Sequence, residues 1–540
     1  MRRAYIFNMI IVLLPALIVG GALAASGDTS DGLKLLFLSL LGCGLIYQAI
    51  KQSHQPLLKW LAIIWWLVFW LHSIILSSTW LLYNSSADAY FILQSLANTS
   101  DAESLEFLQH NTYYIMIALL VWLGLLLVYA WLIKKYFNRH MFAAIEGVKL
   151  HGLLMIFLAL LTATAWAMRP IRALSPPIYW AQYYQKMEHF LTQINEHQLW
   201  HKNWQQAAQK NIQMTPTFAA QQTIVLVLSE SVTSYNLGVC GYPRNTTPYL
   251  QAHIGELTVF CDAYSPYPST LNAIKAMLTD APAGQPDFIP QRSLLADAQA
   301  AGFQTFWLSN QDDAYLSSLF GSFAHHAVYS NKRSGRSSTM KDEAVLPHFK
   351  AALAHPAPRK LIVVHLIGSH PNYAARYPER FAQFPSHNAQ AEAKIAQQLS
   401  QADASLWVQE QRDDYDNSVL YQDWLFGQIL QQVKQNGAEN AENKAVVFVS
   451  DHGNEVGHEK DFAGHSPHTQ AGYRVPVIMW HNRAHALGVN QHTRIDAAQL
   501  DQNMLFIMGL HNQQPSTWLP WTHTAYQFAD NQHYPYWQKP

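Results

Sequence analysis

The sequence predicts an α-helical membrane domain of five transmembrane helices over residues 1–168 and an α/β domain over 221–540. Three observations lead to this prediction. Long apolar stretches fill the first third of the chain, and the last 320 or so residues alternate short apolar runs with helical patterns. Between them, residues 169–220 are rich in Gln, His and Trp, which is typical of an amphipathic linker near a membrane surface.

The five apolar stretches each have about the 17 to 25 residues that a helix needs to cross a bilayer, and none contains Asp or Glu. They cover residues 5–25, 34–50, 58–82, 113–133 and 150–168. Arg2 and Arg3 precede the first stretch, as in a signal peptide, but its length and the four stretches that follow favour a retained span.

Basic residues predict the orientation of these spans. Arg2, Arg3, Lys51, Lys59 and a cluster within 134–149 fall on one side, whereas 26–33 and 83–112 contain acidic residues and no Lys or Arg. Because basic loops stay in the cytoplasm, an odd number of spans puts everything after residue 169 outside it. We therefore expect a multi-pass protein of a bacterial inner membrane with its large domain in the periplasm.

Charge and cysteine content exclude several classes of protein. The net charge is −1 and the pI is near 7.2, so no basic surface indicates nucleic acid binding. The three cysteines, Cys43, Cys240 and Cys261, lack the paired spacing of a cysteine-based zinc site. At most one disulfide, Cys240 to Cys261, can form outside the membrane, and the sequence leaves open whether it does.

Polar side chains follow four strand-like runs of the second part. Glu230 follows TIVLVLS, Asn310 follows FQTFWLS, His370 follows KLIVVHLIGS, and Asp451 follows AVVFVS. Alternating strands and helices predict a parallel sheet covered on both faces, and chemistry in such sheets collects at the carboxyl ends of the strands.

These strand ends predict a metal site. Asp451 and His452 can both reach one ion if the backbone turns sharply, which Gly453 would permit. Glu230 supplies a second carboxylate, and carboxylate with imidazole suits zinc or manganese. Each feature alone is common in loops and caps, and their joint appearance at strand ends favours a site.

The stretch YSPYPSTLNAIKAMLT (264–279) offers a nucleophile. Its prolines forbid a helix up to Pro268, and the later apolar residues have helical spacing, so Thr270 lies at or beside a helix start. Ser269 or Thr270 could serve only as the N-cap. A hydroxyl there could also attack phosphorus, because a helix N-terminus stabilises an anion.

The motifs GYPRNTTP (241–248), GSH (368–370) and SDHG (450–453), with the Thr270 segment, resemble the phosphoethanolamine transferases of Gram-negative inner membranes over nearly the whole chain. The resemblance implies five spans and a periplasmic domain of the alkaline phosphatase and sulfatase fold. It also implies transfer of phosphoethanolamine from phosphatidylethanolamine to a lipopolysaccharide sugar, through a phosphothreonine-type intermediate.

Site residues follow from the resemblance by position. Glu230, Thr270, Asp451 and His452 match zinc ligands, with Thr270 also the nucleophile. His370 and His465 match histidines that hold the substrate phosphate or a second, weaker zinc ion. The chain lacks most cysteines of the lipid A and colistin-resistance branch, and its YPST and WLSNQ segments are nearer the branch that modifies core heptose.

Substrate contacts are expected at three further positions. Within 83–112, Ser95, Thr99 and Glu103 recur every four residues and would share one helical face, which could simply be solvated. The resemblance implies that Thr99 and Glu103 contact the donor head group, and Asn310 is a candidate contact beside the metal.

Two other functions stay open at this point. A phosphoglycerol transferase or phosphodiesterase of the same fold would use the same residues. A membrane scaffold with an inactive domain is the non-enzymatic alternative, although all four expected ligands are present.

Overall fold

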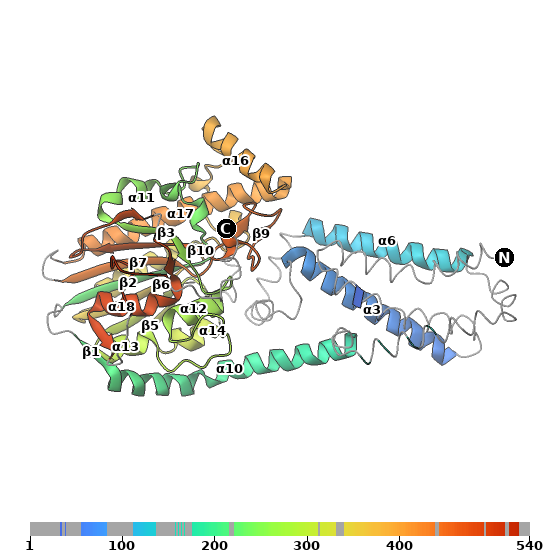
Figure 1. Cartoon of the computed structure of the whole chain (residues 1–540), viewed down its shortest axis with the longest axis horizontal. Helices are drawn as coiled ribbons and strands as arrows, with labels where there is room; N and C mark the ends of the chain where they lie inside the picture. The colour runs from blue at the N-terminus through green and yellow to red at the C-terminus, as the bar shows by residue number, and fades with distance from the viewer. Residues whose placement is uncertain are drawn as a thin grey trace. The chain divides into compact units, whose positions relative to one another are not determined.

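The computed structural model describes residues 56–83, 112–136, 175–214, 221–311, 314–330, 340–437, 442–490, 493–512 and 518–528, with a few isolated positions before residue 168. The chain forms two compact units, and the boundary between them within helix α10 (Pro176–Asn211) falls between Leu191 and Thr192 (Figure 1).

The N-terminal unit contains two helices at the positions of predicted spans. Helix α3 (Pro56–Tyr83) covers the stretch 58–82, and α6 (Thr112–Tyr136) covers 113–133. Trp70 and Trp122 join them edge to face, with ring centroids 5.1 Å apart. Among the helices described, none combines the length and the apolar character needed to cross a membrane.

Several predicted features lie outside the described residues. They are the spans 5–25, 34–50 and 150–168 apart from isolated positions, and the loop that carries Ser95, Thr99 and Glu103.

Helix α10 lies within the linker expected over 169–220, and its second half belongs to the α/β unit. The Trp204 ring is fully buried between Phe320 and Phe323, and its N–H donates to the carbonyl of Pro290 at 2.9 Å. Strand β1 (Ile212–Met214) then pairs antiparallel with β13 (Leu510–Asn512) near the other end of the chain. This half of the expected linker is therefore packed against the domain that it precedes.

The central sheet of the α/β unit has the order β11-β3-β10-β7-β2-β6-β4-β5, with β12 beside β3. Its strands are β2 (Gln222–Ser229), β3 (Thr258–Tyr264), β4 (Gln304–Ser309), β5 (His326–Tyr329), β6 (Arg359–His365), β7 (Asn443–Ser450), β10 (Arg474–His481), β11 (Gly488–Asn490) and β12 (Ile495–Asp496). Strands β7, β2, β6, β4 and β5 run parallel to one another, as the alternation predicts. Every residue of β2 and β7 is buried, because helices cover both faces.

Helices form the outer layers (Figure 1). One face carries α11 (Pro248–Ala252), α15 (Leu346–Leu353), α16 (Ala389–Gln401) and α17 (Leu406–Gln435), and the other carries α12 (Thr270–Leu278), α13 (Leu294–Ala300) and α18 (Leu500–Met508). Val225 and Val227 of β2 belong to the core beneath α15 and α17. Side chains alternate along a strand, so the neighbouring Ile224 and Leu226 point to the opposite face. They are also fully buried, which shows that this face is covered too.

Strand β10 differs from an all-parallel sheet because it runs antiparallel to β7 and β3. No crossover α-helix lies between Ser450 and Arg474, where the described chain contains only the short strands β8 (Glu455–Val456) and β9 (Ala463–Gly464) and a turn of 3₁₀ helix. Without a crossover the chain re-enters the sheet from the edge at which it left.

Gly453 is required for close packing. Its φ is not positive, so no left-handed conformation is needed at this position. A Cβ at this position would lie 2.0 Å from the carbonyl oxygen of Ala471 and 2.9 Å from that of Arg474. The segment after β7 therefore lies directly against the segment that leads into β10.

We predict that Gly453→Ala lowers the free energy of unfolding by about 1–3 kcal/mol, since backbone atoms must move to admit the methyl group. Denaturant unfolding of the purified chain measures this change. Gly255→Ala is the matched control, because a Cβ at Gly255 meets nothing within 4 Å. Equal stability of both variants would contradict the packing argument.

Candidate active site

The predicted site residues meet at the carboxyl edge of the parallel strands. Glu230 follows β2 and Asp451 follows the adjacent β7, with the N–H of Asp451 donating to the carbonyl of Ser229 at 3.0 Å. The N–H of Ser369, beyond β6, donates to the carbonyl of Glu230 at 2.8 Å. Parallel register alone brings these segments together.

Two carboxylates and one imidazole form a buried cluster that could hold a metal ion. Glu230, Asp451 and His452 each offer a ligand atom, and these atoms lie within 4.8 Å of one another. His452 Nε2 is 3.1 Å from Glu230 Oε1 and 3.6 Å from Asp451 Oδ2. All three side chains are 1 % exposed or less.

Thr270 is the first residue of α12, and Ser269 is its N-cap without a capping side-chain bond. The Thr270 hydroxyl lies 3.1 and 3.0 Å from the two oxygens of Glu230 and 3.4 Å from His452 Nε2. Thr270 is thus placed against the cluster. Its hydroxyl donates to Glu230 and does not cap the helix.

One oxygen of the cluster is placed to bind a cation. Asp451 Oδ1 accepts from the backbone N–H of Ser231 at 3.0 Å and from that of His452 at 2.6 Å. Asp451 Oδ2 is buried and makes no hydrogen bond within the described chain. A buried anionic oxygen without a donor is costly, and a metal ion would satisfy it.

Electrostatics also favour a cation here. Burial, and then the charge of Glu230, raise the pKa of Asp451 to about 7. Burial lowers the pKa of His452, but the charges of Asp451 and Glu230 outweigh this and raise it to about 9. Both shifts show that the cluster favours added positive charge, which a divalent ion would supply.

His370 and His465 line the more open side of the cluster. With Glu230 they form a second group whose ligand atoms lie within 4.8 Å of one another. His465 Nε2 is 3.9 Å from Glu230 Oε1, and its ring centroid is 5.5 Å from that of His370. Both histidines are partly exposed, so a substrate could reach them.

Asn310 lies beside the site as a buried residue. Its amide nitrogen donates to Asp342 Oδ1 at 2.9 Å, and Asp342 also accepts from the N–H of Ile367 and of Gly368. Asn310 thus connects the end of β4 to the segment that precedes His370, and its contact with substrate stays a prediction.

Two site residues carried too little sequence signal to be assigned. Ser231 has a φ of +63° and donates its hydroxyl to Glu230 at 2.9 Å. Gln311 donates to Glu230 Oε2 at 3.3 Å. A serine beside a glutamate is ordinary in sequence, and only the left-handed conformation, costly for a residue other than glycine, marks the position.

Three other residues can now be assigned. Arg244 holds its loop through ion pairs with Asp413 and Asp416. His365 lies in the core and contacts the hydroxyl of Ser309 at 3.0 Å. The Nε2 of His458 is 2.6 Å from the side-chain oxygen of Asn236, and burial holds the pKa of His458 well below the ordinary range.

Cys240 and Cys261 form a disulfide, which answers the question that the sequence left open. It joins the turn before Gly241 to β3.

Comparison with known proteins identifies the α/β unit. The sulfatase family profile matches residues 222–523. Phosphoethanolamine transferase EptC of Escherichia coli K12 is 33% identical over 272 residues, which are 48% of this chain and 45% of the relative. Phosphoethanolamine transferase CptA of Salmonella typhimurium is 32% identical over 273 residues, with the same coverage. The chain thus matches about half the length of these relatives.

A solved structure extends the comparison over most of the chain. The integral membrane protein lipooligosaccharide phosphoethanolamine transferase A (EptA) from Neisseria meningitidis aligns with a TM-score of 0.59 and 19% identity, covering 93% of this chain and 96% of that one. The C-terminal periplasmic domain of EcEptC from Escherichia coli, in complex with Zn, aligns at 27% identity and a TM-score of 0.49, covering 56% and 86%. Because the profile match covers more than half of its residues, the chain belongs to the sulfatase family.

Proposed function

We propose that the chain is a zinc-dependent transferase that moves phosphoethanolamine from phosphatidylethanolamine to a sugar of lipopolysaccharide. The observation that carries the proposal is a buried threonine hydroxyl about 3 Å from a carboxylate within a set of metal-ligand side chains. The names of the relatives supply the transferred group. The Salmonella Kdo(2)-lipid A phosphoethanolamine 7''-transferase, 26% identical over 285 residues, supports a lipopolysaccharide acceptor.

Glu230, Thr270, Asp451 and His452 would hold the tight zinc ion, and Glu230, His370 and His465 could hold a second one. A zinc ion at such a site lowers the pKa of a coordinated hydroxyl and neutralises phosphate charge. These side chains fit the role because they are buried, anionic or imidazole groups and leave Asp451 Oδ2 without a protein donor among the described residues.

The reaction would proceed in two displacements. The Thr270 hydroxyl gives its proton to Glu230, to which it already donates, and Oγ forms a bond to the donor phosphorus. The phosphorus bond to the diacylglycerol oxygen breaks, and His370 or His465 gives that oxygen a proton. A sugar hydroxyl then loses its proton to the histidine and forms the new bond to phosphorus, while the bond from phosphorus to Thr270 Oγ breaks and Thr270 regains its proton from Glu230. The exposed edge on the histidine side is where both the donor and the acceptor would enter.

The acceptor is a core heptose in this proposal. The YPST and WLSNQ segments resemble the branch that modifies the lipopolysaccharide core more than the lipid A branch. In the structure, YPST is the segment that brings Thr270 to Glu230, and WLSNQ ends in Gln311, which donates to the same carboxylate. Both segments therefore lie where they could influence which acceptor is used.

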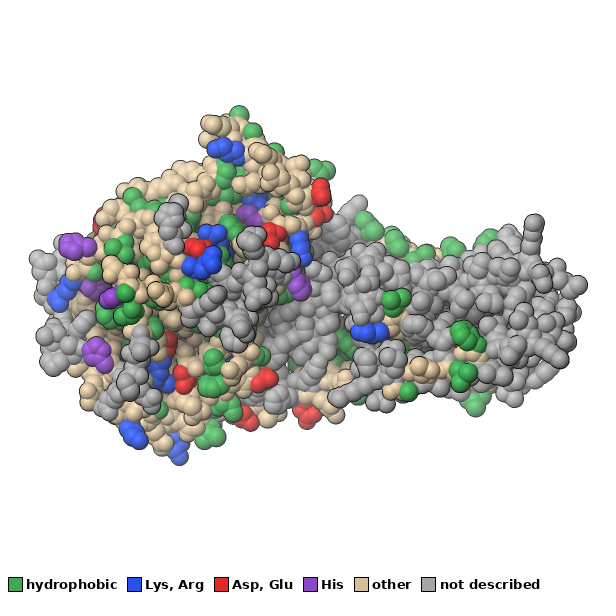
Figure 2. Space-filling view, viewed as in Figure 1, with side chains coloured by type: hydrophobic (Ala, Val, Ile, Leu, Met, Phe, Trp, Pro, Cys, Tyr) green, Lys and Arg blue, Asp and Glu red, His purple; other side chains and the backbone are tan. Residues whose placement is uncertain are grey.

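We also propose an inner-membrane protein with five spans in residues 1–168 and the catalytic domain in the periplasm. The alignment with an integral membrane protein over most of the chain supports this arrangement. Figure 2 shows hydrophobic side chains at the surface of the N-terminal helices, where Leu71 and Leu120 are each 61% exposed. The disulfide supports an oxidising compartment such as the periplasm.

The metal proposal predicts about one tightly bound zinc ion per chain. Asp451→Ala and His452→Ala should lose it, because each removes a ligand from a buried site. Elemental analysis of the purified chain measures the content, with Glu410→Gln as a control at an exposed carboxylate. Zinc-free protein that keeps full activity would refute the metal requirement.

The nucleophile proposal predicts that cells with the parent chain add the mass of phosphoethanolamine to lipopolysaccharide, whereas cells with Thr270→Ala do not. The reason is that alanine cannot form the bond to phosphorus, although zinc content should be largely kept. Mass spectrometry of lipopolysaccharide reads the transfer, and the same method should find the increment on the Thr270 peptide of the parent. Thr270→Ser keeps a hydroxyl and should retain part of the transfer. Full transfer by Thr270→Ala would refute the assignment.

The donor proposal concerns Thr99 and Glu103, which would contact the phosphate and the ammonium group of the lipid. Thr99→Ala or Glu103→Ala should lower transfer from phosphatidylethanolamine in membranes about tenfold, as expected when one charge-assisted hydrogen bond is lost. Zinc content should not change. Glu106→Ala, in the same loop, is the control. If transfer is unaffected, the donor docks elsewhere.

A further inference from the structure

A cavity lies in the α/β unit, across α17 from the metal-ligand cluster. Ser418 and Gln422 of α17 point to the strand ends, where they bond Ser369 at 2.8 Å and Asp342 at 2.9 Å. Leu420 and Trp424 are offset from them by two residues, or about 200° around a helix. These two residues line a cavity of about 460 Å³, within the range of roughly 300–1,000 Å³ typical of ligand sites.

The cavity wall combines aromatic rings with amides. The rings are Tyr249, Phe381, Phe384 and Trp424. The amides include Asn245, Gln383 and Gln428, whose side chains make no hydrogen bond with any residue that the structure describes. Each such amide can donate and accept hydrogen bonds, so the wall offers a ligand both donors and acceptors.

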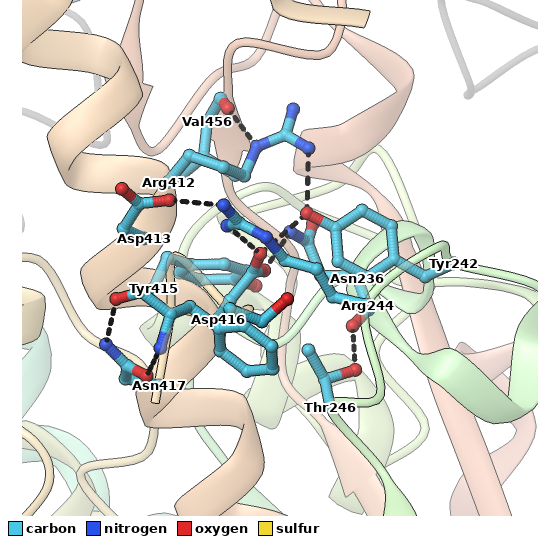
Figure 3. Close-up of polar contacts among 12 residues, drawn as sticks. Asn236, Tyr242, Arg244, Thr246, Arg412, Asp413, Tyr415, Asp416, Asn417 and Val456 are labelled. Atoms are coloured by element: carbon cyan, nitrogen blue, oxygen red, sulfur yellow. Dashed lines mark hydrogen bonds and ion pairs between the residues drawn. The ribbon is translucent and has the colours of Figure 1, made fainter. Parts of the chain in front are cut away.

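The cation of the cavity wall is already paired with carboxylates, and the carboxylate there already accepts two hydrogen bonds. Figure 3 shows the Arg244 guanidinium among carboxylates, and it lies 2.6 Å from Asp413 and 2.7 Å from Asp416. The carboxylate of Asp423 accepts from the backbone N–H groups of Tyr249 and Leu250 at 2.7 and 3.1 Å. A phosphate would find no unpaired cation here among the described residues, which favours a neutral ligand.

We propose that this cavity binds a neutral sugar unit of the acceptor oligosaccharide, beyond the unit that receives the phosphoethanolamine. Aromatic rings pack against the C–H face of a sugar, and free amides bond its hydroxyls. This inference rests on the proposed function, because that function makes an oligosaccharide the acceptor.

One turn of α17 connects the cavity to the reaction centre. The hydroxyl of Tyr415 donates to the carbonyl of Ser231, next to Glu230, at 2.7 Å. The following residue, Asp416, holds Arg244 of the cavity wall. Asn417 accepts from the N–H groups of Gln383 and Phe384 at 2.7 and 2.8 Å. A sugar chain bound in the cavity would therefore be fixed relative to the metal ligands.

The test is binding of dephosphorylated core oligosaccharide, released from lipopolysaccharide, to the full chain in detergent, measured by calorimetry. Trp424→Ala should raise the Kd about tenfold and Gln383→Ala about threefold, as expected for losing a stacked ring and one hydrogen bond. Gln397→Ala removes an exposed amide from α16 that does not line the cavity, and should bind like the parent. Because Gln383 is exposed, its variant should fold even if Trp424→Ala does not.

Three results would overturn the proposal: no binding by the parent, equal binding by both cavity variants and the parent, or displacement of the oligosaccharide by ethanolamine, which would indicate a cation site. Asp451→Ala separates this test from the proposed function, because it should abolish transfer and keep oligosaccharide binding. A parent that binds the oligosaccharide but transfers nothing would refute the function and leave the cavity result standing.

Discussion

The burial of two carboxylates beside one imidazole is the constraint on which the catalytic edge depends. Glu230 and Asp451 are nearly inaccessible to water, and like charges so close together oppose folding unless protons or a cation compensate them. The surrounding chain is arranged accordingly. Backbone N–H groups point at one oxygen of Asp451, and hydroxyl and amide donors surround Glu230. The sheet register, the strained Ser231 and the start of α12 all serve this arrangement.

Packing around the cluster explains the path of the chain between β7 and β10. The chain leaves the sheet, passes the ligands and returns antiparallel in β10 without a covering α-helix. Close backbone contact at Gly453 holds the outgoing and returning segments together. Because the returning segment also carries His465, the same fold-back brings that histidine to the open side of the cluster. The antiparallel return of the chain into β10 therefore decides which histidine reaches the site.

Sequence reasoning succeeded where local pattern decides the structure. Apolar runs gave the strands β2, β4, β6 and β7, and the polar residues after them gave Glu230 and Asp451, because parallel strands must end at one edge. It failed where distant contacts decide. The direction of β10, the role of Gly453 and the contact of His458 with Asn236 each depend on segments that approach only in the fold. The cavity beside α17 is of this kind too, since its walls come from three separate stretches of chain.

The helical period of α17 has a consequence for variation in length. Its residues alternate between contacts with the strand ends and contacts with the cavity wall, over a helix that continues unbroken from Leu406 to Gln435. Inserting or deleting one residue between Ser418 and Trp424 would rotate everything beyond it by about 100° and turn each set of side chains away from its partners. A residue added or removed beyond either end of this stretch would leave both sets of contacts in place.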